Sequence, residues 1–263
     1  MPLASKRFVF VGSETGRVRN DGRICAMTIP AINMRALPLW AAVVPLGTVV
    51  VCYLIAVGLG HVPACIPNFS GCTSVSSTGR MLPESLVFRA GMLPTALVLA
   101  LFWQRCVTFL ALGGQTGARL VMLRILGVVI ALSLVIYALT LGLEDDGYPQ
   151  LRRAAINGFA LSTLLAEVLL ISCYRPMRIV ATRNLLRWLI VLCWALPLLG
   201  IAAEVAKWAG VSRHAANNIV AWNAFVLASA YYAVVAQIWR HHGFSTECHL
   251  AVPGHTDSYK GDR

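Results

Sequence analysis

The chain has 263 residues, of which 58% are hydrophobic and only 13% are charged. A soluble globular domain carries about 25% charged residues, so the composition excludes that class and predicts an integral membrane protein. The formal net charge of +11 does not indicate nucleic-acid binding, because the basic residues are spread over many short polar segments.

Residues 1–35 form a polar, basic segment without a continuous apolar stretch. The absence of such a stretch argues against a cleaved secretory signal, and we expect a disordered tail. Met27 and Met34 stand shortly before the first apolar segment, so a start at either residue is a further hypothesis. Mass spectrometry of the N-terminal residue would test it, and finding Met1 would contradict it.

Six apolar segments follow, each long enough to cross about 30 Å of hydrocarbon as an α-helix, which takes roughly 20 residues. Their approximate bounds are 37–60, 89–112, 120–143, 154–174, 188–209 and 218–239. Continuous apolar runs also exclude the alternating pattern of a β-barrel. The sequence therefore predicts an all-α, polytopic membrane protein: a bundle of six transmembrane helices in one domain, 36–240, with a tail at 241–263.

The basic residues predict the orientation of this bundle. If the N-terminus lies inside, 16 of the 22 Lys and Arg residues fall on the inner face, as the positive-inside rule favours. The other six, on the outer face, are Arg80, Arg89, Arg152, Arg153, Lys207 and Arg213. Both termini are then predicted to be cytoplasmic, and the acidic segment Glu144–Asp146 lies outside.

The connection from Pro67 to Arg89, between the first two segments, is unusually long and dense in Ser, Thr, Gly and Pro. A long loop between membrane helices is typical of a functional segment. Cys65 and Cys72 belong to the same outer connection, where an oxidising compartment would permit a disulfide that stiffens it. Two unrelated free thiols are the alternative.

Two acidic residues lie inside predicted spans, where a charge is costly and usually faces a partner or a cavity. Glu167 lies roughly 10 Å from the inner end of its span, and we favour an ion pair with Arg124, which enters from the same face. Glu204 lies near the outer end of its span, at the level of Arg89 and Asn223. The sequence therefore predicts an outer polar pocket. Its candidate residues are Ser74, Ser76, Glu84, Arg89, Glu204 and Asn223.

An equal alternative to this pocket is purely structural. Arg89 and Glu204 would neutralise each other, and Asn223 would join helices by hydrogen bonds, as polar residues in membranes often do.

Signatures of catalysis are absent from the sequence. It has neither a His-Glu-x-x-His motif nor a Gly-x-Ser-x-Gly motif, and no His lies deep in a predicted span. His61 and His214, at the outer boundary, could in principle serve as bases for a loop serine, but the sequence does not show that either lies near one. We therefore predict no metal and no cofactor, assign no catalytic residue, and lean away from an enzyme.

Several residues nevertheless resemble a known family. The pattern Ile66-Pro67-Asn68-Phe69, Ser74-Val75-Ser76, Gly79, Pro83-Glu84-Ser85 and Phe88-Arg89, together with the polar start of the last span at 217–225, resembles the Frag/DRAM/Sfk family of six-span membrane proteins. The resemblance implies six helices with cytoplasmic termini and work on lipids, such as remodelling of the GPI anchor. Family members often carry an acidic residue further along the last span, where this chain has Ala228, Ser229 and Ala230.

These observations favour a protein that recognises or helps to remodel a membrane lipid or lipid anchor through the outer polar pocket. In this reading Arg89 binds a phosphate or carboxylate, and membrane lipids are the partners. The alternatives are a small transporter or channel that uses Glu167 and Glu204, or an assembly partner of another membrane protein. Helices broken by Pro at repeated positions would favour transport, but Pro197 is the only such residue that we identify.

Overall fold

The computed structural model describes residues 36–143, 147–175 and 183–241. The predicted tails at 1–35 and 242–263, both alternative start residues and the acidic segment at 144–146 lie outside the described residues. The described helices belong to one compact unit, Asn33–Thr246. The seven helices of these described ranges are α1 Leu37–Gly58, α2 Pro67–Ser70, α3 Glu84–Leu112, α4 Ala118–Thr140, α5 Tyr148–Tyr174, α6 Arg183–Trp208 and α7 Arg213–His241.

Six of these helices are long and apolar enough to cross a membrane, so the predicted all-α fold with six spanning helices is confirmed. Four helices start about one turn before their predicted bounds: α3, α5, α6 and α7. Each added turn contains charged or polar residues, because a helix continues beyond the hydrocarbon into the headgroup region. Pro45 and Pro94 also lie inside helices, so the prediction that Pro197 is alone in that respect is wrong.

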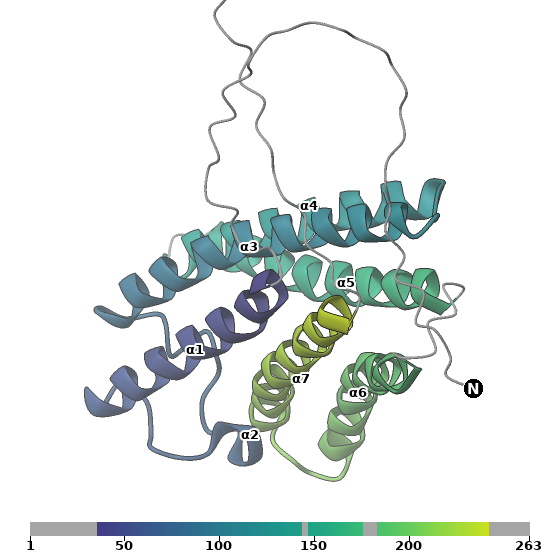
Figure 1. Cartoon of the computed structure of the whole chain (residues 1–263). Coiled ribbons are helices and arrows are strands. Elements are labelled where there is room, and N and C mark those ends of the chain that lie inside the picture. The colour runs from purple at the N-terminus through teal and green to yellow at the C-terminus, as the bar shows by residue number, and fades with distance from the viewer. Residues whose placement is uncertain (1–35, 144–146, 176–182, 242–263) are drawn as a thin grey trace, which may run out of the picture. The chain divides into compact units, whose positions relative to one another are not determined.

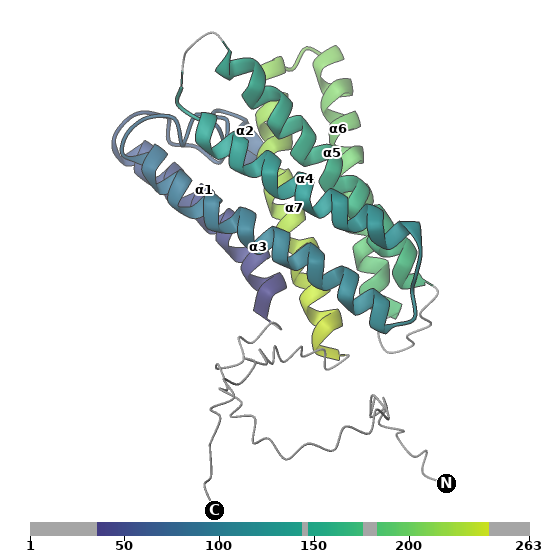
Figure 2. The same cartoon turned by 90° about the horizontal axis from the view of Figure 1, so that it is seen from above.

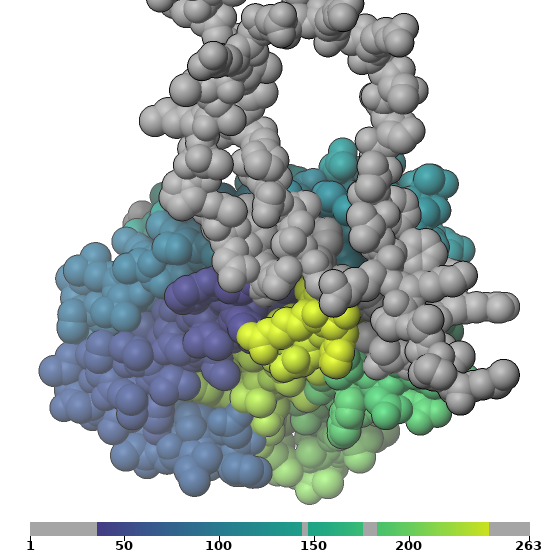
Figure 3. All heavy atoms as spheres, viewed as in Figure 1, coloured from purple at the N-terminus to yellow at the C-terminus, as the bar shows by residue number. Residues whose placement is uncertain are grey.

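The spanning helices pack in an order that differs from their order in the chain. Going round the bundle, α6 contacts α7, α7 contacts α1, α1 contacts α3, α3 contacts α4, and α4 contacts α5. The contact between α5 and α6 completes the ring but is much smaller than the others. Figure 1 shows α3, α4 and α5 along one side and α1, α7 and α6 along the other. Figure 3 shows the last turns of α7, in yellow, between α1 and α6.

The two ends of the bundle differ. One end, the loop end, carries α2, the connections 59–83 and 209–212, and the residues 141–143 that follow α4. The other, the terminal end, carries the start of α1 and the end of α7 (Figure 2). At the terminal end aromatic rings from α3, α5 and α7 pack together. The ring of Phe102 lies 5.0 Å from those of Trp103 and Tyr232, and that of Phe109 lies 5.8 Å from Tyr174. This packing closes the core there.

Candidate functional site

A cavity of about 790 Å³ runs from the loop end into the middle of the ring of helices. All six spanning helices and the first loop contribute to its wall. Most of the lining side chains are apolar, and examples are Met92, Ile156, Leu196 and Phe225. The cavity lies inside the ring of helices, whose weakest neighbouring contact is that between α5 and α6. Its size and apolar wall suit a small amphiphile.

Basic side chains gather where the cavity meets the loop end. Arg80 comes from the first loop, and Arg152 and Arg153 come from the first turns of α5. None of the three forms an ion pair with a described residue. The Tyr137 side chain of α4 lies close to Ser76, Arg80 and Arg152. The mouth of the cavity is therefore a polar, positively charged rim above apolar walls.

The first loop supplies hydroxyl groups to this rim. Ser74 and Ser76 both line the cavity, and their Oγ atoms lie 3.1 Å apart. Ser77 holds them in a tight turn: its backbone N–H donates to Ser74 Oγ at 3.0 Å, and its hydroxyl donates to the Ser74 carbonyl at 2.7 Å. The turn keeps the two hydroxyls beside the arginines.

The loop itself is fastened to α1 and α7. Cys65 and Cys72 form a disulfide, and the Tyr53 hydroxyl of α1 donates to the Cys65 carbonyl at 2.6 Å. From α7, Trp222 Nε1 donates to the Thr73 carbonyl at 2.9 Å, and Asn223 Nδ2 donates to the Asn68 carbonyl at 2.9 Å. These bonds fix the position from which the serines reach the cavity.

Replacing Asn223 by Ala should therefore loosen the first loop. The change removes the donor to the Asn68 carbonyl, and one such bond contributes about 1 kcal/mol. We expect faster protease cleavage within residues 59–83, measured on protein in detergent micelles. Asn217→Ala is the matched control, because Asn217 is exposed and makes no hydrogen bond with a described residue. Equal cleavage rates for the two variants would contradict this role of Asn223.

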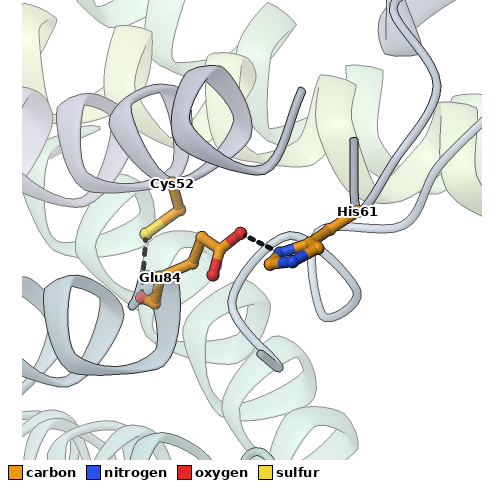
Figure 4. A network of polar contacts seen from close by, with 3 residues as sticks. All are labelled: Cys52, His61 and Glu84. Atoms are coloured by element: carbon orange, nitrogen blue, oxygen red, sulfur yellow. Dashed lines mark hydrogen bonds and ion pairs between the residues drawn. The ribbon is translucent and has the colours of Figure 1, made fainter. Parts of the chain in front are cut away.

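A second polar cluster lies at the loop end, outside the cavity. His61 Nδ1 lies 2.6 Å from Glu84 Oε1, and the Cys52 thiol donates to the Glu84 carbonyl at 3.6 Å (Figure 4). Glu84 is 1% exposed, and its Oε2 is buried without a hydrogen-bond partner. An imidazole oriented by a carboxylate is one part of a nucleophilic triad. No described hydroxyl or thiol contacts His61, so the pair fastens the α1–α3 connection to the start of α3.

The other candidate residues make different contacts from those expected. Arg89 Nη2 donates to the Leu141 carbonyl at 2.9 Å and so joins α3 to the end of α4. Glu204 lines the cavity but is 66% exposed and pairs with Lys207 at 2.6 Å. The alternative that Arg89 and Glu204 neutralise each other is therefore wrong.

The ion pair expected between Glu167 and Arg124 is also absent. Glu167 is buried and lines the deep part of the cavity, whereas Arg124 is exposed. Within the described part of the chain, the carboxyl of Glu167 forms neither an ion pair nor a side-chain hydrogen bond. A buried carboxyl in this state is a candidate functional group.

The cavity thus unites three of the six candidate residues, Ser74, Ser76 and Glu204, whereas Glu84, Arg89 and Asn223 support the surrounding structure. Sequence reasoning missed the three arginines of the rim. Their signal was present: the adjacent basic pair Arg152 and Arg153 stands at the same predicted face as the first loop.

No protein-family model, curated protein or solved structure matches the chain. The assignment of a function therefore rests on the geometry of the cavity. The likeness to the Frag/DRAM/Sfk family stays a resemblance carried by the first loop and the last span. The chemistry of the cavity is the basis for the function proposed below.

Proposed function

We propose that this integral membrane protein binds a membrane lipid with an anionic headgroup. The headgroup lies at Arg80, Arg152 and Arg153, and the apolar chain fills the cavity below them. One observation carries the proposal: an apolar cavity of about 790 Å³ whose mouth is lined by arginines without an ion-pair partner among the described residues. This arrangement matches the two chemical halves of an anionic lipid.

Each half of the site has a physical reason to bind. Guanidinium groups are donors in a planar fork and bind phosphate or carboxylate in pairs of hydrogen bonds. Ser74 and Ser76 add hydroxyl contacts at the same level. Apolar walls exclude water from the chain and favour close packing against it. In this proposal the arginines of the rim take the role that the sequence suggested for Arg89.

The proposal includes an orientation, with the loop end in the outer leaflet and both termini in the cytoplasm. The Cys65–Cys72 disulfide supports it, because disulfides persist in oxidising compartments. The distribution of Lys and Arg supports it as well. The resemblance to the Frag/DRAM/Sfk family is in accord with a lipid or a lipid anchor as the partner and suggests remodelling as the purpose of binding.

The proposal predicts that Arg152→Gln/Arg153→Gln loses bound anionic lipid. Because two of the three rim cations are removed, we expect affinity for a long-chain phosphatidic acid to fall at least tenfold, equal to about 1.4 kcal/mol. Native mass spectrometry of the protein in detergent micelles, titrated with phosphatidic acid and phosphatidylcholine, measures this.

Arg213→Gln is the matched control for that experiment. Arg213 stands at the same end of the bundle, at the first position of α7, and does not line the cavity. Its replacement should leave the affinity unchanged. The proposal is wrong if the control and the double variant lose the lipid equally, or if the wild-type protein does not distinguish the two headgroups.

Transport is a second candidate, favoured by the finding that Glu167 and Glu204 line the same cavity. For a transporter the terminal end would have to open, and aromatic rings close it in this structure. Flux through reconstituted vesicles that is lost in Glu167→Gln would support this candidate. Lipid binding without flux would leave a binding protein or an assembly partner.

A further inference from the structure

The deep end of the cavity contains polar groups that the rim cannot explain. Glu167 and Thr163 of α5 and Tyr232 of α7 all line it, and they are 4%, 6% and 3% exposed. Thr163 Oγ1 and the Tyr232 hydroxyl are buried without any hydrogen-bond partner. The carboxyl of Glu167 also has no partner among the described residues. We call these three residues the deep polar group.

The members of the deep polar group lie at one level of the bundle. Thr163 and Glu167 are four residues apart, so they share one face of α5. The Tyr231 hydroxyl donates to the Glu167 carbonyl at 3.2 Å, so α7 meets α5 at this point, one residue from Tyr232. Glu167 follows Arg153 by 14 residues. At about 1.5 Å per residue Glu167 lies about 21 Å along α5 from Arg153, and Thr163 lies about 15 Å from it.

Buried polar groups without hydrogen-bond partners lower the stability of the fold if they serve packing alone. Buried side-chain polar atoms almost always find a partner, and exceptions call for an explanation. The neighbouring residue Ser162 is also buried, but it does not line the cavity. The unsatisfied atoms therefore belong to residues that border the space that a ligand would fill.

We propose that the deep polar group binds a hydroxyl on the apolar part of the ligand, so that the ligand is an anionic lipid with a hydroxylated chain. This inference rests on the proposed function, because it assigns the far end of the same bound molecule. The carboxyl of Glu167 accepts a hydrogen bond from the chain hydroxyl. The hydroxyls of Thr163 and Tyr232 donate hydrogen bonds to the oxygen of the chain hydroxyl. An unsubstituted chain leaves all three groups without partners.

The experiment compares three probes on the full chain in nanodiscs of phosphatidylcholine. The probes are hexadecyl phosphate, ω-hydroxyhexadecyl phosphate and ω-methoxyhexadecyl phosphate. The methoxy probe keeps the oxygen of the hydroxyl probe but cannot donate a hydrogen bond. We expect the hydroxyl probe to bind roughly tenfold more tightly than the other two, equal to about 1.4 kcal/mol. Displacement of a fluorescent alkyl phosphate measures the affinities.

Two variants place the preference at the deep polar group. Thr163→Val and Glu167→Leu should both reduce the preference for the hydroxyl probe, measured as the ratio of its affinity to that of hexadecyl phosphate in the same variant. Thr163→Val is nearly isosteric and keeps the test available if Glu167→Leu fails to fold. Ser162→Ala, the neighbouring control, should keep the full preference.

The outcomes separate this inference from the proposed function. Equal affinities of the wild-type protein for all three probes would overturn the hydroxyl site and leave lipid binding intact. A preference that survives in Thr163→Val and Glu167→Leu would also overturn it. If none of the probes binds, both the inference and the proposed function are wrong.

Discussion

Replacing His61 by Ala is expected to lower the free energy of unfolding by about 3 kcal/mol. Removing one partner of a buried pair leaves the other charge without compensation, which costs about 3–5 kcal/mol. We expect the low end because the His61 side chain is 26% exposed, whereas Glu84 is 1% exposed and its second oxygen already lacks a partner. Unfolding in mixed micelles, followed by circular dichroism, measures the loss.

A second substitution identifies the cause. If the loss comes from an isolated carboxylate, Glu84→Gln in the His61→Ala background should recover about 1–2 kcal/mol, because a neutral amide is less costly to bury. Lys207→Ala is the control, since it removes the partner of the exposed Glu204 and should cost at most about 1 kcal/mol. The interpretation fails if His61→Ala and Lys207→Ala have equal effects.

The second large effect is expected for Gly71→Ala. Gly71 ends α2 with φ +60°, a conformation that costs other residues about 1–2 kcal/mol. A Cβ atom there would also lie 2.8 Å from the Cα atom of Ala215, in the backbone of α7. Because a backbone cannot turn aside as a flexible side chain can, the first loop must move. We expect a total loss of about 3 kcal/mol and faster proteolysis of residues 59–83.

Gly60→Ala separates the two contributions. Gly60 has φ +74°, but nothing lies within 4 Å of a Cβ atom at that position. It should therefore show the conformational cost alone, about 1 kcal/mol, with little change in proteolysis. If both variants behave alike, the contact between α2 and α7 does not position the first loop. Loss of phosphatidic acid binding in Gly71→Ala only would link that contact to the rim.

The sequence was sufficient to locate the six spans along the chain but not to predict the direction in which each side chain points. Apolar run length identified the six spans, and Ser74, Ser76 and Glu204 do lie at the cavity. Arg89 lies in the second turn of α3, near the loop end, yet it donates to the Leu141 carbonyl at the end of α4 and does not line the cavity. The direction in which a side chain points depends on which helices are neighbours. Here α7 packs between α6 and α1, and hydropathy does not predict this order.

The same limit explains the acidic residues. Glu84 was assigned to a loop, but α3 begins there, so the side chain is buried against His61. The pair of Glu167 and Arg124 was inferred from similar depths on adjacent spans in the chain. Depth alone allows this pair, but Arg124 points out of the bundle. A single sequence does not determine how a helix is rotated about its axis.

The aromatic packing at the terminal end separates the cavity from that end of the bundle. Phe102 and Trp239 stack beyond Tyr232, the last cavity residue of α7, and both are fully buried. A molecule that enters between the loop-end arginines therefore does not leave through the terminal end in this structure. Amphiphiles then compete for one cavity, and the residence time of the bound ligand determines its occupancy. A tightly bound ligand prevents the next one from binding for as long as it stays.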